Sequence, residues 1–308
     1  MYDLDDLLER TSRTYALTIP FLPEPTRHEV AIAYLMMRVV DTFEDAETWS
    51  TAARCEALDA FGRLIHFEAD PDLAETQAFA ARLDANPPSS HAGYQELLHE
   101  LPGLLADLAT VGRAQRDRIV LYTQKMIDGM KETLRVSERR DGAIVIESLA
   151  ELRDYCYFVA GLVGEMLTEL MLLDAEQLLP AAASLRAKAR LFGEALQLTN
   201  ILKDSGVDAK EGRSFLKDAA RRSEAFELAR SDLRTAAEYI DTLQKHGAPV
   251  GYLGFTAFPV KLAIATLRQV EAKGPGHKIS RDDVARALLE LQSALDTNAR
   301  PVPEIDGI

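Results

Sequence analysis

Cysteine is scarce in this sequence of 308 residues, where Cys55 and Cys156 are the only two. Two cysteines exclude a disulfide framework and a cysteine metal site, and they fit a reducing cytoplasm. A glycine-rich dinucleotide fingerprint is absent as well. A dinucleotide would therefore have to bind in a non-Rossmann way.

Basic residues are also in deficit, with 35 Lys and Arg against 49 Asp and Glu and a net charge of −14. This balance argues against nucleic acid as a partner, because nucleic-acid binding depends on basic side chains that neutralise phosphates. No apolar run reaches the roughly 18 residues that a membrane-spanning helix needs. The acidic, amphipathic start is unlike a signal peptide. We therefore expect a cytoplasmic protein that is at most peripheral to a membrane.

The composition is globular, with 47% hydrophobic residues, 17 Gly and 13 Pro. Apolar residues recur mostly at helical spacing, and no domain boundary interrupts them. We predict an all-α fold and a single domain over residues 1–308. The predicted helices cover residues 3–14, 24–45, 51–69, 149–173, 180–203, 222–245, 259–273 and 280–296, with a pair of helices within 101–135. Residues 70–90 are surface-like, and the β-branched run 141–146 permits a two-stranded hairpin.

Three oxygen-bearing side chains recur at four-residue intervals in an otherwise apolar segment: Asn200, Asp204 and Asp208. On a helix, positions four apart turn by about 40° and rise by about 6 Å, so these side chains share one face. Carboxylate and amide oxygens are ligands of Mg²⁺, which keeps its other positions for water and substrate phosphate. Taken alone, the pattern is more often a solvated helix edge.

A second acidic group places Asp41 and Asp45 four residues apart, with Glu44 beside them and Arg38 one turn earlier. Like charges at this spacing repel each other by a few tenths of a kcal/mol, roughly, on an isolated helix. They follow the apolar run 30–40, which predicts a buried helix. Acids at the end of a buried helix are usually paired or metal-bound. Two such acidic columns facing each other would bind a diphosphate through bridging Mg²⁺.

Four motifs occur in the order in which a known family has them. They are S-R-[ST]-[FY] at 12–15, a first Asp-rich motif at 34–45, a close match to Y-C-x-Y-V-A-G-L-V-G at 155–164, and Q-x-x-N-I-x-R-D-x-x-x-D at 197–208. The chain thus resembles the squalene and phytoene synthases, the head-to-head prenyl transferases. The resemblance implies the isoprenoid synthase helical bundle with a central cavity. It also implies a reaction that starts from two allylic diphosphates, most often farnesyl diphosphate, with geranylgeranyl diphosphate as the alternative.

The resemblance assigns roles to individual residues. Mg²⁺ ions that neutralise the leaving diphosphate would be held by Asp41, Asp45, Asn200, Asp204 and Asp208. Candidates for direct contact with the diphosphate are Ser12, Arg13, Tyr34, Arg38, Lys203 and Arg213.

Tyr155 matches a family tyrosine that helps to remove a proton as the cyclopropane of presqualene diphosphate closes. From the residue alone, a core tyrosine with a satisfied hydroxyl is the plainer interpretation. The small residues Ala160, Gly161 and Gly164 flatten one helix face. That face suits either the border of a prenyl tunnel or close helix packing.

The motifs point to more than one product. Residues 258–267 are similar to a segment of reductive squalene synthases, and residues 276–281 resemble the basic segment that binds NADPH phosphate there. Lys278 and Arg281 are the candidate cofactor contacts. By contrast, residues 197–201 and 164–168 resemble bacterial phytoene or dehydrosqualene synthases, and Lys203 stands where the family usually has arginine.

We predict Mg²⁺-dependent condensation of two farnesyl diphosphates to squalene with reduction by NADPH. One alternative is the same fold and first step with release of presqualene diphosphate, dehydrosqualene, phytoene or another terpene without reduction. A second is a non-catalytic helical binding or assembly protein. We expect no nucleic-acid partner, no transmembrane anchor, and peripheral membrane contact for release of an apolar product.

Overall fold

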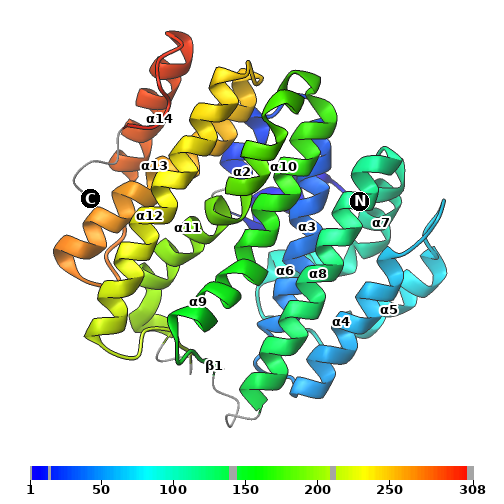
Figure 1. The fold of residues 1–308 in the computed structure, drawn as a ribbon. Helices are drawn as coiled ribbons and strands as arrows, with labels where there is room; N and C mark the ends of the chain where they lie inside the picture. Colours follow the sequence, from blue (N-terminus) through cyan, green and yellow to red (C-terminus); the bar gives the residue numbers. More distant parts are fainter. Residues whose placement is uncertain (1, 13–14, 139–143, 209–212, 304–308) are drawn as a thin grey trace. The chain divides into compact units, whose positions relative to one another are not determined.

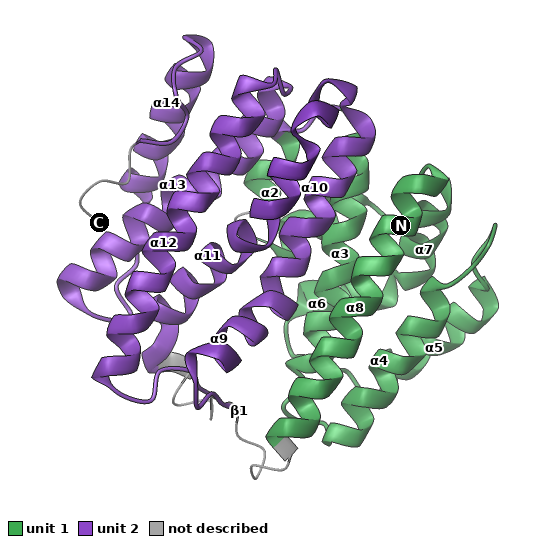
Figure 2. Ribbon diagram, viewed as in Figure 1, with its two compact units in different colours: residues 1–20, 24–138 green, residues 21–23, 139–308 purple. Residues whose placement is uncertain are grey.

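The computed structural model describes residues 2–12, 15–138, 144–208 and 213–303, and for residues 138, 144, 207, 208 and 213 the backbone alone. The chain separates into two compact units (Figure 2). Unit 1 comprises Met1–Pro20 and Glu24–Glu138, and unit 2 comprises Phe21–Pro23 and Arg139–Ile308. Both units are built of helices (Figure 1), which confirms the predicted all-α class. The single domain and its central cavity stay predictions.

Unit 1 is organised around the helix α3 (Thr26–Glu44), most of whose residues are buried. It packs against the long helix α8 (Arg113–Glu138), and α4 packs against α8 in turn. The other helices of the unit are α1 (Leu4–Thr11), α2 (Tyr15–Thr18), α4 (Thr51–Ile65), α5 (Leu73–Ala85), α6 (Ala92–His99) and α7 (Leu101–Thr110). The 3₁₀ turn η1 (Ile19–Phe21) links this unit to the next.

Unit 2 is organised around the helix α11 (Ala182–Asp208), which packs against α10, α12 and α13. Its helices are α9 (Leu149–Cys156), α10 (Leu162–Asp174), α11, α12 (Ala219–Lys245), α13 (Val250–Lys273) and α14 (Arg281–Asp296). The short elements are β1 (Ile144–Val145), the π-helical turn η2 (Tyr157–Gly161), the 3₁₀ helix η3 (Glu176–Ala181) and β2 (Arg213–Ser214).

Most predicted helices are confirmed, with shifted ends. The predicted helix 51–69 ends at Ile65, and residues 70–90, predicted as surface-like, contain α5. Asp72 caps α5 by accepting a hydrogen bond from the Glu75 amide. The helix predicted to begin at Pro259 begins at Val250 instead, with Pro259 inside it. The apolar residues of α13 are so thoroughly buried that tertiary packing outweighs the missing amide of the proline.

The predicted hairpin in residues 141–146 is wrong. Ile144 and Val145 pair in parallel with Arg213 and Ser214, which lie far along the chain. The amide of Ile146 continues the pairing by donating to the Ser214 carbonyl at 2.9 Å. A local run of β-branched residues indicates a strand but says nothing about its partner.

Small residues bring α10 and α11 into backbone contact. A Cβ atom on Gly164 would lie 2.1 Å from the Ala189 carbonyl oxygen, and one on Gly193 would lie 2.0 Å from the Ala160 oxygen. No real Cβ atom fits at such distances. Of the two interpretations of the flat face, the structure therefore favours close helix packing at Gly164.

Two helical stretches, Leu149–Asp174 and Val250–Lys273, are long and apolar enough to cross a membrane by length and composition alone. The prediction that no stretch reaches this length is wrong by that measure. In the second stretch, 72% of the most apolar window is buried inside the structure, as in the core helix of a folded domain.

Candidate active site

The first Asp-rich motif forms a compact polar cluster within unit 1. The Tyr34 hydroxyl donates to the Thr11 carbonyl at 3.1 Å and accepts from the Arg38 Nε and Nη2 atoms at 3.2 and 3.1 Å. Arg38 Nη1 lies 3.3 Å from Asp41 Oδ2. Arg38 thereby offsets the repulsion between the carboxylates of this motif.

Aromatic rings hold the Arg38 guanidinium in place. Its Cζ lies 5.4 Å from the centre of the Tyr34 ring and 5.5 Å from that of Tyr94. Burial opposes the charge, but Asp41 and Tyr34 raise the pKa of Arg38 above its ordinary value. Arg38 is therefore a fixed cation, half-exposed beside Asp41.

The two other acids of this motif differ in environment. Asp45 is exposed and ends α3 as its C-cap, whereas the Glu44 side chain is buried. Only Asp41 and Asp45 therefore lie where an ion from solvent reaches them. Ser12 ends α1, and its hydroxyl accepts a hydrogen bond from the Tyr15 amide at 2.9 Å. Arg13 lies outside the described residues.

The second Asp-rich motif converges on one cation within unit 2. Lys203 Nζ lies 3.1 Å from the Asn200 Oδ1 atom and 3.1 Å from the Asp204 Oδ2 atom. The ammonium of Lys203 thus stands between two predicted metal ligands, with both oxygens directed at a single positive centre. Asp208 is the last residue of α11, and Arg213 begins β2. The side chains of both lie outside the described part.

Two contacts hold the end of α11 that carries this motif. Arg222 of α12 donates to the Ser205 hydroxyl at 3.0 Å and to the Leu202 carbonyl at 3.4 Å. The amide of Gly276, in the segment between α13 and α14, donates to the Lys203 carbonyl at 2.7 Å. Gly276 has a φ of +85°, which a side chain would strain. The sequence motifs give Arg222 no role and include Gly276 only in the candidate cofactor segment 276–281, although Gly274 and Gly276 around a proline indicate a tight turn.

Tyr155 is 8% exposed in α9 and lies two residues before the π-helical turn η2. Its ring packs on Phe215, just after β2, with ring centres 4.9 Å apart. π-helical turns are rare and often occur at functional sites. The ring of Tyr155 thus joins α9 to the segment that follows the second Asp-rich motif.

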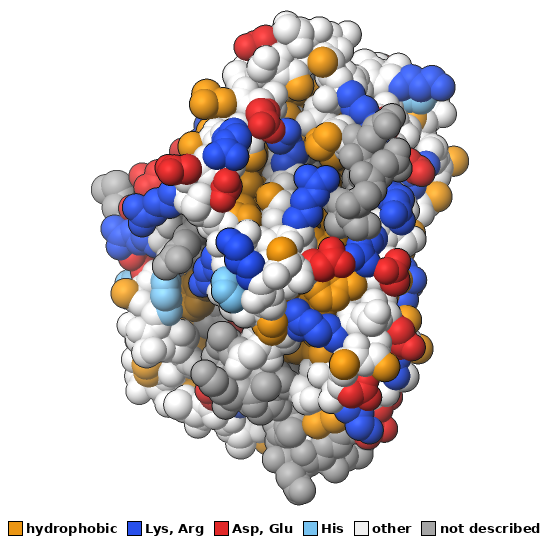
Figure 3. Space-filling model, turned by 90° about the vertical axis from the view of Figure 1, so that its left-hand side faces the viewer, with side chains coloured by type: hydrophobic (Ala, Val, Ile, Leu, Met, Phe, Trp, Pro, Cys, Tyr) orange, Lys and Arg blue, Asp and Glu red, His pale blue; other side chains and the backbone are white. Residues whose placement is uncertain are grey.

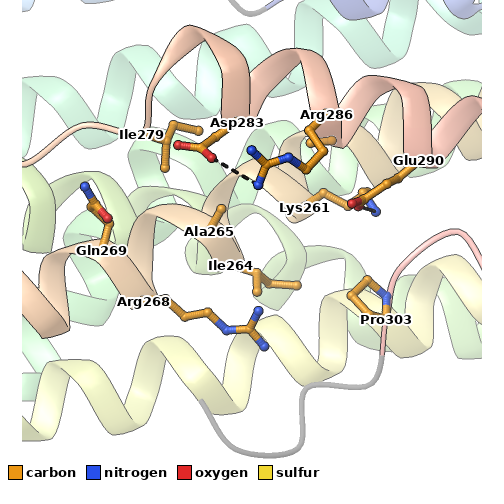
Figure 4. A pocket seen from close by; sticks show the side chains of 11 residues that line it. Lys261, Ile264, Ala265, Arg268, Gln269, Ile279, Asp283, Arg286, Glu290 and Pro303 are labelled. Carbon is orange, nitrogen blue, oxygen red and sulfur yellow. Dashed lines mark hydrogen bonds and ion pairs between the residues drawn. The ribbon is translucent and has the colours of Figure 1, made fainter.

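The candidate cofactor contacts Lys278 and Arg281 are both exposed. They flank Ile279, which lines a hollow of about 380 Å³ between α13 and α14. Figure 4 shows that Arg268 and Gln269 come from α13, whereas Asp283 and Arg286 come from α14. Arg286 Nη1 lies 3.6 Å from Asp283 Oδ1.

The described residues contain no group of three or more His, Cys, Asp and Glu side chains able to hold a metal by themselves. Mg²⁺ is generally bound by one or two carboxylates together with water and substrate phosphates, so a smaller set of ligands suits it. The convergence of Asn200 and Asp204 on the Lys203 ammonium shows that these oxygens fit a cation.

Comparison with known proteins identifies the family. A model of the family described as squalene/phytoene synthase matches residues 8–218, which include both Asp-rich motifs and Tyr155. The chain belongs to the squalene/phytoene synthase family. This confirms the resemblance inferred from the four motifs.

Individual members agree with this assignment. A squalene synthase of Bos taurus is 32% identical over 209 residues, covering 68% of this chain and 44% of that protein. The chain matches less than half the length of the first such curated relatives. A ligand complex of TcSQS aligns with a TM-score of 0.71 and 24% identity, over 96% of this chain and 88% of the other. A dehydrosqualene synthase in complex with a ligand aligns with a TM-score of 0.60 and 20% identity, over 96% of this chain and 95% of the other. These two structures support the isoprenoid synthase fold.

Proposed function

We propose that this member of the squalene/phytoene synthase family condenses two farnesyl diphosphates head to head, through presqualene diphosphate, to squalene. We further propose Mg²⁺ for the ionisation and NADPH for the reduction. The observation that carries the proposal is the pair of oxygens from Asn200 and Asp204 that meet at one cation. Family membership supports the reaction class.

The metal ligands in this proposal are Asp41, Asp45, Asn200, Asp204 and Asp208. When bound, Mg²⁺ stabilises the negative charge that develops on the departing diphosphate. Lys203 would turn from Asn200 and Asp204 toward the diphosphate as the metal takes its place, because its single point charge suits either partner.

Direct contacts to the diphosphate fall to Ser12, Arg13, Tyr34, Arg38, Lys203 and Arg213. Arg38 is the best supported of these in the structure, since Tyr34, Tyr94 and Asp41 fix its guanidinium before substrate arrives. A fixed guanidinium binds phosphate with two parallel hydrogen bonds and loses little side-chain entropy on binding.

Tyr155 is assigned to the removal of a proton as the cyclopropane ring closes. Its burial against Phe215 keeps water from the phenol. A hydroxyl in such a place takes part in proton transfer only if its orientation is held within narrow limits.

For NADPH, the contact between Gly276 and the Lys203 carbonyl is the supporting observation. It places the turn that precedes Lys278 directly on the second Asp-rich motif. Lys278 and Arg281 are the proposed contacts to the cofactor phosphates, beside the hollow of Figure 4.

We propose a cytoplasmic location with peripheral membrane contact for release of the apolar product. On the face shown in Figure 3, basic side chains lie among acidic and apolar ones. This mixture, together with the net charge of −14, favours apolar contact over attraction to an anionic surface.

Product analysis tests the proposal. The purified protein is incubated with farnesyl diphosphate and Mg²⁺, with and without NADPH, and the products are identified by mass spectrometry. We expect squalene only in the presence of NADPH. If presqualene diphosphate or a dehydro product forms under both conditions, the protein catalyses the non-reductive reaction and the proposed reduction is wrong. No consumption of either farnesyl or geranylgeranyl diphosphate would favour a binding or assembly protein.

Arg222 provides a second test, because it holds the end of α11 without touching the proposed metal. Arg222→Met keeps the aliphatic contact and removes the donors to Ser205 and Leu202. We expect the Mg²⁺ concentration for half-maximal protection against thermal unfolding, in the presence of inorganic diphosphate, to rise about tenfold.

The matched control for this test is Arg221→Met, on the same helix, which removes an ion pair with Glu224 at 2.8 Å. It should leave the metal titration unchanged. Equal titrations for both variants would show that Arg222 does not support the metal ligands.

A further inference from the structure

An ion network joins three helices of unit 2 beside Tyr155. Arg153 Nη2 of α9 lies 3.2 Å from Glu194 Oε2 of α11 and 3.6 Å from Asp232 Oδ1 of α12. Both acidic side chains are almost fully buried, at 0% and 3% exposed. Glu194 also pairs with Arg190, one turn earlier on α11. Two buried acids are thus held by two half-exposed arginines.

Asp232 is the weakly satisfied member of this network. Its Oδ2 atom is buried and has no hydrogen-bond partner in the described part of the chain. The charged groups that act on it are Arg153 from α9 and Glu194 and Arg190 from α11. Burial raises the pKa of Asp232 to about 6, although Arg153 opposes the shift. A buried carboxylate with one unpaired oxygen lowers stability, so its presence needs a reason other than stability.

The helix that this network holds changes its hydrogen bonding just after Tyr155. α9 is the first segment of the continuous helical stretch Leu149–Asp174, and the π-helical turn η2 separates it from α10. Arg190 lies over the ring of Tyr157, with its Cζ 4.5 Å from the ring centre. Contacts from α11 and α12 therefore reach the chain on both sides of Tyr155. Because a π-helical turn is a place where a helix can bend, the orientation of α9 relative to α10 depends on such tertiary contacts.

We propose that the network of Arg153, Glu194 and Asp232 positions Tyr155 for proton removal. The inference rests on the role of Tyr155 in the proposed function. With Asp232 charged, Arg153 lies between two carboxylates and fixes the rotation of α9. With Asp232 neutral, Arg153 follows Glu194 alone, and Tyr155, two residues further on, moves with the helix. These are positioning residues, since none of them needs to touch substrate.

Asp232→Asn tests the proposal, because it keeps the size of the side chain and removes its charge. Above the pKa of Asp232 we expect kcat with farnesyl diphosphate to fall about tenfold while KM stays nearly unchanged, as for a small misplacement of a reacting group. In the wild-type protein, kcat should fall as the pH is lowered through about 6. In Asp232→Asn this step should be missing, because the asparagine side chain at position 232 is neutral at every pH.

Asp241→Asn is the control, since Asp241 lies on the same helix and pairs with the surface residue Arg300 at 2.6 Å. It should keep both the wild-type kcat and the acid step. The proposal is overturned if Asp232→Asn keeps the wild-type kcat, or if it loses activity while the acid step persists.

Hydrogen exchange separates this inference from the proposed function, because it needs no turnover. At a single pH above the pKa of Asp232, amides in residues 149–161 should exchange faster in Asp232→Asn than in the wild-type protein. In Asp241→Asn they should exchange at the wild-type rate. Unchanged exchange in Asp232→Asn would contradict the proposal that the network fixes the orientation of α9. The exchange difference between wild type and Asp232→Asn could also be found in a protein that does not consume farnesyl diphosphate. That result would contradict the proposed function and the role of Tyr155, and it would retain the network as a support for α9.

Discussion

Replacing Asp204 by asparagine should abolish turnover, with a loss of about a thousandfold or more, and leave the helical circular dichroism spectrum intact. The asparagine keeps the size of the side chain but lacks the charge that a divalent cation needs. In the wild-type protein, the ion pair between Asp204 and Lys203 is partly exposed, with 37% of the Asp204 side chain accessible. Loss of such a pair costs less than about 1 kcal/mol of folding free energy. Activity should therefore fall without unfolding.

Asp241→Asn is a close control for this prediction as well. Asp241 is also 37% exposed and also pairs with a basic residue, Arg300, on a helix of the same unit. It should retain full activity. Asp41→Asn, in the other motif, should behave like Asp204→Asn, as it removes the carboxylate beside Arg38. Retained turnover in both Asp41→Asn and Asp204→Asn would refute the metal assignment.

Gly193→Ala should destabilise unit 2 by about 3 kcal/mol. The new methyl group would lie 2.0 Å from the Ala160 carbonyl oxygen and 3.0 Å from the Gly161 amide nitrogen. These are backbone atoms of the π-helical turn, and they cannot rotate away as the end of a side chain does. The turn η2 must therefore move away from α11, which loosens their packing. Urea unfolding followed by circular dichroism measures the effect.

Gly206→Ala, on the same helix, provides the matched comparison. A Cβ atom there meets no heavy atom within 4 Å among those described. Alanine favours the helical conformation over glycine, so this variant should be up to about 1 kcal/mol more stable than wild type. Equal unfolding midpoints for the two variants would mean that η2 and α11 are not in close backbone contact.

The sequence alone predicts well those features that repeat along it. The apolar period predicts α3, α12 and α14 to within a few residues of their ends. The four-residue spacing of Asn200 and Asp204 was enough to place both on one side of α11. Periodicity and capping are local properties, so they survive folding unchanged.

Features that depend on distant residues could not be predicted from local pattern. The phosphate contact predicted for Lys203 stays a prediction; in the structure its ammonium donates to Asn200 Oδ1 and pairs with Asp204. The approach of Arg153 to Asp232 joins residues 79 apart, from 232 minus 153. A charge in an amphipathic helix looks solvated until the opposing helix is known.

The parallel pairing of β1 with β2 has a consequence for folding kinetics. Ile144 and Arg213 are 69 residues apart, from 213 minus 144, and the loop they close contains α9, α10 and α11. Closing so long a loop has an entropic cost that hydrogen bonds between two-residue strands cannot offset by themselves. We therefore expect the strands to pair after the helices between them have packed, beyond the transition state. They would then slow the unfolding of the native protein and leave its folding rate nearly unchanged.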